Sequence, residues 1–236
     1  MSESLRIQFE RNLAAVRERI AGAATRSGRG AKAVTLVAVT KYVDAATTRL
    51  LAQAGASALG ESRPQQLLSK VQAISDPPIE WHLIGHLQRN KIRRVLPVVS
   101  LIHSVDSLRL LEAIDRVAAE GGLRPRVLLE VNVSHERAKH GFSESDMPEA
   151  VERLAAISNV TVCGLMAMAG LESDQDETRR EFARLRELRD RLRRAVPEGH
   201  SLDALSMGMS GDFEEAIEEG ATIVRVGSAL FEGIGP

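Results

Sequence analysis

Eight short apolar runs alternate with amphipathic helical patterns along most of this 236-residue chain. The runs predict strands at residues 34–40, 56–60, 80–85, 99–104, 126–133, 161–168, 202–206 and 222–226. The helical patterns lie near residues 44–54, 63–74, 87–95, 107–120, 145–157, 175–195 and 212–219, and the short tail after Val226 is expected to be the eighth helix. Because strands that alternate with helices pair in parallel, eight such units in about 200 residues predict an α/β fold, a single (β/α)8 TIM barrel. An open, doubly wound sheet usually has fewer strands and is the second alternative.

The N-terminal segment adds one more helix to this pattern. Apolar residues spaced three or four apart predict an amphipathic helix over residues 4–26, through Leu5, Phe9, Leu13, Val16 and Ile20. No linker rich in proline, glycine or serine divides the chain after it. We therefore expect residues 1–236 to form one barrel domain with an extra N-terminal helix.

The bulk composition argues against several classes of protein. A formal net charge of −1 gives no long-range attraction to nucleic acid or to an anionic membrane. Cys163 is the only cysteine, which excludes an internal disulfide and a cysteine-rich metal site. Neither a signal peptide nor an apolar run of about 20 residues is present. We expect a cytoplasmic monomer with no nucleic-acid or membrane partner.

Lys41 ends the first apolar run, which reads Val34-Thr-Leu-Val-Ala-Val-Thr-Lys41. A strand this apolar is typical of a parallel sheet covered on both faces, so the lysine stands at the mouth of a packed core. There its amine can lose part of its hydration, which favours the neutral form that attacks a carbonyl to form a Schiff base. In the alternative reading, Lys41 only marks the end of the strand and extends into water.

Glycine and hydroxyl residues follow the seventh and eighth predicted strands. The seventh ends in Leu205-Ser-Met-Gly-Met-Ser-Gly-Asp212 and the eighth in Val224-Arg-Val-Gly-Ser-Ala229. In (β/α)8 barrels these two loops commonly bind phosphate, because glycine lets backbone N–H groups approach an anion. The alternative is that Gly208 and Gly227 only form turns, and that Ser206, Ser210 and Ser228 cap helices.

Arg225 and two histidines are further polar residues in or beside strands. Arg225 lies among apolar residues of the eighth strand, so we expect it to pair with a barrel carboxylate or to contact a ligand. His82 and His86 are four residues apart, but His86 follows Gly85 and no third ligand has a useful spacing. We therefore expect no metal site, and interpret His82 as a pocket or core residue.

Several stretches together resemble the pyridoxal phosphate homeostasis protein family, which has the fold of the alanine racemase N-terminal barrel. The matching stretches are Leu36–Lys41, Gly60-Glu61, Trp81–Gln88 with Asn90-Lys91, Ile102–Ser107, Val131–Val133 with Lys139 and Gly141-Phe142, Gly164–Met166, Leu205–Phe213 and Val224–Gly227. They follow the order of the family over nearly the whole chain. The Ser-Met-Gly-Met-Ser stretch and the Ile-Gly-His-Leu-Gln stretch are its most specific parts.

The resemblance implies that the chain binds pyridoxal 5′-phosphate as a Schiff base on Lys41. It implies that the phosphate is held by Ser206, Gly227 and Ser228, and that the pocket is lined by Met207, Met166 and His82. It places Arg225 at the pyridine nitrogen, and it matches Lys139 to a second family lysine near the cofactor. Ser62 departs from the family pattern, since the family usually has asparagine there, and the amide contact expected from asparagine is therefore in doubt.

Two functions remain open from the sequence. The first is a regulator that holds pyridoxal phosphate and influences its free level in the cell, with client apo-enzymes as partners. The second is an amino-acid racemase or a related enzyme. Two-base racemisation needs a second acid–base group on the far face of the substrate, which the barrel racemases take from a tyrosine in a C-terminal domain. Here the sequence ends at Pro236, and Tyr42 is beside Lys41. Because arginine keeps its proton, Arg225 would leave the pyridine unprotonated and a weak electron sink, so we favour the non-catalytic regulator.

Overall fold

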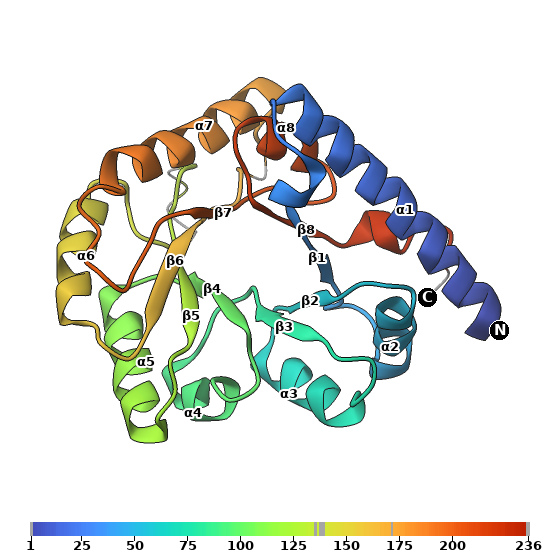
Figure 1. The fold of residues 1–236 in the computed structure, drawn as a ribbon, viewed down its shortest axis with the longest axis horizontal. Helices are drawn as coiled ribbons and strands as arrows, with labels where there is room; N and C mark the ends of the chain where they lie inside the picture. Colours follow the sequence, from blue (N-terminus) through green and yellow to red (C-terminus); the bar gives the residue numbers. More distant parts are fainter. Residues whose placement is uncertain (1, 135, 137–139, 171, 235–236) are drawn as a thin grey trace.

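The computed structural model describes residues 2–134, 136, 140–170 and 172–234, and its eight parallel strands close into a barrel (Figure 1). The strands follow one another around the barrel in sequence order, with β1 paired to both β2 and β8. Their bounds are β1 Thr35–Val39, β2 Ala58–Glu61, β3 Glu80–Leu83, β4 Leu101–Val105, β5 Arg126–Glu130, β6 Thr161–Met166, β7 Ala204–Ser206 and β8 Ile223–Val226. The predicted (β/α)8 barrel is confirmed, and each strand falls within or beside its predicted range.

Helices surround the barrel, and the N-terminal helix completes the ring (Figure 1). Their bounds are α1 Ser2–Arg26, α2 Ala45–Gln53, α3 Pro64–Ala73, α4 Ile92–Val95, α5 Leu108–Gly121, α6 Met147–Arg153, α7 Gln175–Leu192 and α8 Phe213–Glu218. Only a short 3-10 turn, Ser228–Leu230, follows β8 within the described residues, and α1 packs between α8 and α2. The extra helix therefore covers the side of the barrel that a helix after β8 would otherwise cover. No helix in the described part is both long and apolar enough to cross a membrane.

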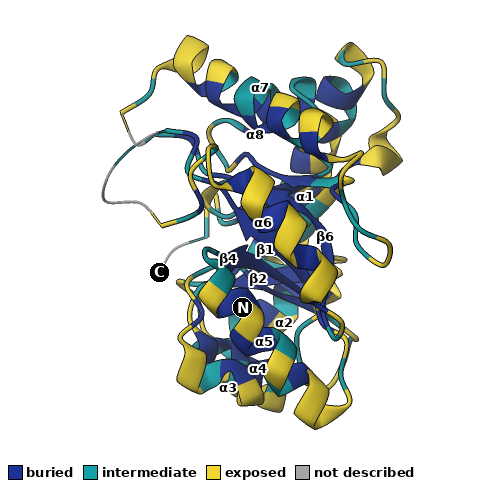
Figure 2. Cartoon of the chain, turned by 90° about the vertical axis from the view of Figure 1, so that its left-hand side faces the viewer, coloured by how far each residue is buried: buried dark blue, intermediate teal, exposed yellow. Residues whose placement is uncertain are grey.

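The interior of the barrel changes from apolar to polar along the strands. Figure 2 shows the buried strands between helices that are exposed on their outer faces. The inward-facing residues nearer the start of the strands include Leu101, Leu128 and Ile223, in one apolar cluster. Two positions further along, where side chains return to the same face, the buried residues are His103, Glu130 and Arg225. The polar side chains therefore gather near the C-terminal ends of the strands, where barrel active sites lie.

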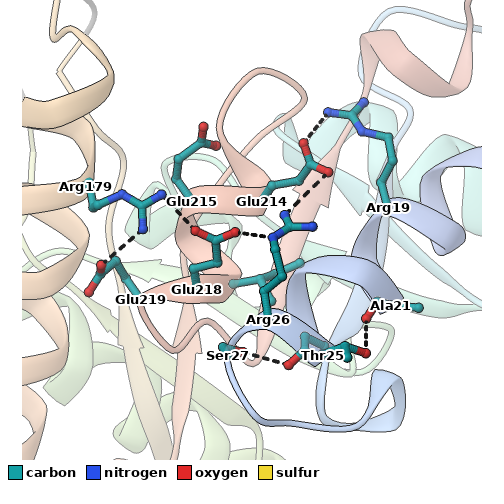
Figure 3. Close-up of polar contacts among 12 residues, drawn as sticks. Arg19, Ala21, Thr25, Arg26, Ser27, Arg179, Glu214, Glu215, Glu218 and Glu219 are labelled. Carbon is teal, nitrogen blue, oxygen red and sulfur yellow. Dashed lines mark hydrogen bonds and ion pairs between the residues drawn. The ribbon is translucent and has the colours of Figure 1, made fainter.

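An ion-pair network joins the helices on one side of the barrel (Figure 3). Glu218 of α8 accepts hydrogen bonds from Arg26 of α1 at 2.7 Å and from Arg179 of α7 at 2.8 Å. Glu214, also on α8, pairs with Arg19 at 3.0 Å. The outer face of α7 is therefore exposed to solvent but also forms ion pairs with α8. The same network holds α1 against α8.

Candidate cofactor site

Lys41 lies one residue beyond Thr40 at the C-terminal end of β1, beside the loop that follows β8. Ala38 is paired in register with Val226, so Gly227 lies next to the end of β1. The Lys41 side chain is half-buried, and its Nζ lies 4.9 Å from the centre of the Tyr42 ring. Tyr42 itself is 89% exposed. The amine therefore stands at the open mouth of the barrel, where a small molecule can reach it.

The loops after β7 and β8 are joined to each other at this mouth. The Gly227 N–H donates to Ser210 Oγ at 3.0 Å. Within the described residues, the backbone N–H groups of Ser228 and Ala229 have no hydrogen-bond partner. Gly208 has a φ of +90°, and a Cβ there would lie 2.6 Å from the Cβ of Ala216, so this position requires glycine. Free N–H groups beside two hydroxyls form a suitable cradle for an anion such as a phosphate.

A chain of four buried side chains crosses the barrel beneath this mouth. Arg225 Nη1 donates to Ser206 Oγ at 2.6 Å, and Ser206 Oγ lies 2.9 Å from His103 Nδ1. His103 Nε2 in turn lies 2.9 Å from His82 Nδ1. Since β4 and β7 are not neighbouring strands, the bond between His103 and Ser206 crosses the interior. We call these four hydrogen-bonded side chains, Arg225, Ser206, His103 and His82, the relay.

Both relay histidines are neutral at pH 7. Burial lowers the pKa of His82 to about 4, and the charge of Arg126 adds a smaller effect. Burial also lowers the pKa of His103 well below its usual value, helped by the charges of His82 and Arg225. Because arginine can only donate, Ser206 Oγ accepts a hydrogen bond from Arg225 and can donate its own O–H in a hydrogen bond to His103 Nδ1. His103 Nε2–H can then donate to His82 Nδ1, which leaves His82 with a proton on Nε2.

We expect the relay to make the protein less stable in mild acid. An unfolded histidine binds a proton below about pH 6.5, while folded His82 binds one only below about pH 4. The unfolded state therefore binds more protons in this window, and stability falls as the pH falls, by on the order of 3 kcal/mol for His82. Urea unfolding at several pH values measures this loss. His103→Asn should reduce the dependence of the free energy of unfolding on pH, whereas His86→Asn, at an exposed position, should leave it unchanged. The same pH dependence in both variants would contradict the conclusion that the buried histidines are neutral.

Arg225 has carboxylates near it as well as the relay. It is 4% exposed, and its Nη2 donates to the carbonyl of Ala167 at 3.0 Å. Burial lowers its pKa to about 10, while the charges of Asp212 and Glu130 oppose that shift. Burial is also the main cause of the raised pKa of Glu130. Arg225 therefore remains charged at neutral pH. Both roles expected for it, pairing with barrel carboxylates and facing a ligand, are compatible with this position.

A buried ion pair supports the backbone just before Lys41. Lys70 of α3 donates to Glu61 Oε1 and, at 2.8 Å, to the carbonyl of Thr40. Thr40 Oγ1 also donates to Glu61 Oε1, at 2.6 Å. Glu61 is fully buried, and its Oε2 has no hydrogen-bond partner within the described residues. The pair thus fixes Thr40, and with it the starting point of the Lys41 side chain.

Removal of one partner of this pair should be strongly destabilising. We expect Lys70→Met to lower the free energy of unfolding by about 3–5 kcal/mol, because it leaves the Glu61 carboxylate buried and unpaired. Lys32→Met is the matched control, since Lys32 is exposed and should change stability by less than about 0.5 kcal/mol. The double variant Lys70→Met with Glu61→Leu should recover much of the loss. A Lys70→Met variant as stable as the parent in urea would refute this account of the pair.

Most of the site residues predicted from the sequence come together. His82, Met166, Ser206 and Arg225 are buried side chains in or at the ends of four strands, and Gly227 and Ser228 lie in the loop above them. Met207 is different, because it packs in the core cluster between the strands and the helices. Consecutive strand residues face opposite sides, so Ser206 and Met207 cannot both face the interior.

Other residues of the site were missed or lie outside the described part. His103, Glu130 and Lys70 were not singled out from the sequence. Alternation along β4 and β5 could have indicated the first two, since each follows an inward-facing leucine by two positions. The predicted role of Lys139 falls outside the described residues.

Comparison with known families identifies what this barrel resembles. The model of the family "Alanine racemase, N-terminal domain" matches residues 11–234. A pyridoxal phosphate homeostasis protein from Aquifex aeolicus is 42% identical over 219 residues, covering 93% of this chain and 95% of that protein. A protein of the same name from Pseudomonas aeruginosa is 40% identical over 220 residues, covering 93% of each.

Solved structures agree with the sequence comparison. The structure of PipY from Synechococcus elongatus with PLP bound superposes with a TM-score of 0.83 at 35% identity, covering 94% of this chain and 99% of that chain. A structure from Bifidobacterium adolescentis gives a TM-score of 0.90 at 37% identity, covering 98% and 97%. Because the family model matches nearly the whole chain and the relatives are of nearly equal length, the chain belongs to the pyridoxal phosphate homeostasis protein family.

Proposed function

We propose that this protein binds pyridoxal 5′-phosphate as a Schiff base on Lys41 and holds it for use elsewhere in the cell. The observation that carries the proposal is the position of Lys41, at the mouth of the barrel and beside the joined loops after β7 and β8. The bound state of PipY, which is 35% identical, supports the choice of cofactor.

The residues of the site fit the three parts of this cofactor. The amine of Lys41 would attach its aldehyde carbon, with the aldehyde oxygen leaving as water. The phosphate would be held by the free N–H groups of Ser228 and Ala229, with the Ser210 and Ser228 hydroxyls beside them. Arg225 would contact the pyridine nitrogen from below. When bound, the cofactor supplies an electron sink for amino-acid chemistry, which a charged arginine weakens.

We assign Ser206 a positioning role rather than the direct phosphate contact expected from the sequence. Its hydroxyl already accepts from Arg225 and lies 2.9 Å from His103 Nδ1. It is fully buried below the loops, while Ser228 is exposed at the mouth. Ser206 would therefore hold Arg225 in place, and the phosphate would be left to the hydroxyls of Ser210 and Ser228 and the free N–H groups of Ser228 and Ala229.

An experiment with the purified chain tests the binding proposal. The protein is incubated with pyridoxal phosphate, gel-filtered and examined by visible absorption before and after borohydride. We expect about one cofactor per chain, with a visible band that borohydride removes while the cofactor stays attached. Absence of any retained cofactor would overturn the proposal.

The racemase alternative shares the barrel and is separated by a different measurement. Tyr42 lies beside Lys41 and is exposed, so it is not placed to act from the opposite face of a bound substrate. A missing general acid or base costs about 10²–10⁴ in rate, and the charged Arg225 weakens the electron sink further. We expect only trace exchange of the Cα proton of alanine or serine in deuterated water, followed by NMR with saturating cofactor. Sustained exchange at about 1 s⁻¹ or faster would restore the enzyme hypothesis.

The open position of Lys41 also bears on cofactor transfer. A half-buried amine beside an exposed tyrosine leaves one side of a bound cofactor accessible to solvent. We propose that client apo-enzymes receive the cofactor from this side.

A further inference from the structure

We propose that His86, Asp106 and His140 form a binding site for a divalent transition-metal ion at the rim of the barrel. His86 Nδ1 lies 3.1 Å from Asp106 Oδ2, and His140 Nδ1 lies 3.8 Å from the same oxygen. One possible ligand atom from each residue lies within 4.8 Å of the others. Metal bonds of about 2.0–2.2 Å to such atoms require only small movements of the side chains.

The three residues lie in the loops that follow three neighbouring strands. His86 follows β3, Asp106 follows β4 and His140 follows β5. They are separated by 20 and 34 positions in sequence, so spacing along the chain could not reveal them, and this juxtaposition supplies the third ligand that the sequence lacked. The site lies across the barrel from β8, and therefore on the far side of the mouth from Gly227.

Neighbouring groups orient the carboxylate as they do in known metal sites. The Asp106 side chain is only 12% exposed, and its Oδ1 accepts a hydrogen bond from Ser107 Oγ at 3.0 Å. This bond leaves Oδ2 directed at the two imidazoles. Outer hydrogen bonds of this kind orient metal ligands and tune their affinity. The two imidazole rings are stacked, with centres 5.0 Å apart.

Buried Glu130 adds negative charge on the interior side of the site. Glu130, at the end of β5, is buried, and after burial itself the charge of Asp106 is the next cause of its raised pKa. A positive ion bound at Asp106 would offset the repulsion between that carboxylate and Glu130. The charge of Arg225 opposes part of the effect of Asp106 on Glu130.

The donor set selects the class of metal. Two imidazole nitrogens and one carboxylate oxygen suit Zn²⁺, Co²⁺, Ni²⁺ or Cu²⁺, whereas Mg²⁺ and Ca²⁺ prefer oxygen ligands. A bound ion would cross-link the loops after β3, β4 and β5 and retain open positions toward solvent. The proposal is independent of the cofactor, because none of the three residues is assigned to hold it.

Titration of the metal-free full chain tests the proposal. Chelator-treated protein is titrated with Zn²⁺ by calorimetry and with Co²⁺ by visible absorption. We expect one saturable ion per chain with each metal, and no binding of Mg²⁺ at the same concentrations. His86→Gln and His140→Gln should each weaken Zn²⁺ binding at least about tenfold, comparable to the loss of a supporting ligand. Both side chains are largely exposed, 49% and 67%, so these variants should fold normally.

Matched variants make the outcome decisive. His200→Gln removes a histidine outside the cluster, and Glu149→Gln removes an exposed carboxylate, so both should bind Zn²⁺ like the parent. No saturable binding of Zn²⁺ or Co²⁺, or equal affinity in the parent and in both cluster variants, would overturn the proposal. In that case the three residues would form only a histidine–aspartate ion-pair cluster.

Discussion

The Lys41→Ala variant is expected to retain no covalently attached pyridoxal phosphate while keeping its fold. Within the described structure, the half-buried Lys41 side chain makes no hydrogen bond, so its removal leaves no polar group without a partner. The free energy of unfolding should therefore change by less than about 1 kcal/mol. The phosphate loops remain, and weak, non-covalent binding should persist. The measurements are cofactor content after gel filtration, the visible spectrum with borohydride, and urea unfolding.

Lys91→Ala is the matched control for Lys41→Ala. Lys91 follows β3 and is half-buried like Lys41, but it lies on another side of the barrel. It should keep one borohydride-fixable cofactor per chain. Full covalent retention by Lys41→Ala would show that another amine holds the cofactor.

Replacement of Arg225 by glutamate should give the second-largest effect. The variant loses two charge-assisted hydrogen bonds, to Ser206 and to the Ala167 carbonyl, and each contributes about 1.5–3 kcal/mol. It also places a third carboxyl group near Asp212 and Glu130. If the free energy of one such hydrogen bond is lost from cofactor binding, the dissociation constant of the cofactor rises about ten- to hundredfold. A carboxylate can pair with a protonated pyridine, so the spectrum of any bound cofactor should shift toward the ring-protonated form.

Two further variants separate the effects of Arg225. Arg225→Leu removes the charge without offering a carboxylate, so it should weaken retention without the spectral shift. Arg153→Glu, on the exposed face of α6, should bind cofactor like the parent. An unchanged affinity and spectrum in Arg225→Glu would mean that this arginine is only a structural partner of the barrel carboxylates.

The barrel could be predicted because its physical cause lies in local patterns. The strand Thr35–Val39 is buried on both faces at its middle, at Val37 and Ala38, and it reads as a continuous apolar run. Helices such as Leu108–Gly121 show one apolar face. The N-terminal helix was predicted from the spacing of residues such as Phe9 and Leu13, which are buried. Its position between α8 and α2 depends on long-range packing that no local pattern contains.

The site was predictable only where its residues stand next to a strand end or a glycine loop. Lys41 and Gly227 have such signals. The bond between His103 and Ser206 joins residues 103 positions apart, and the Lys70 contact with Thr40 joins a helix to a strand end. No local sequence pattern indicates either of these two contacts. The misplacement of Met207 has a simpler cause, since strand alternation allows only one of two consecutive residues to face the interior.

Peptide mapping of the borohydride-reduced protein tests the central claim most directly. The chain has five lysines, which are Lys32, Lys41, Lys70, Lys91 and Lys139. Lys32 is in the turn before β1, at the opposite end of the barrel, and Lys70 is committed to Glu61. We expect the reduced pyridoxyl group on the peptide that contains Lys41, at about one per chain, and on no other lysine in comparable amount. A pyridoxyl group found on Lys91, Lys139 or another lysine, with none on Lys41, would contradict the account.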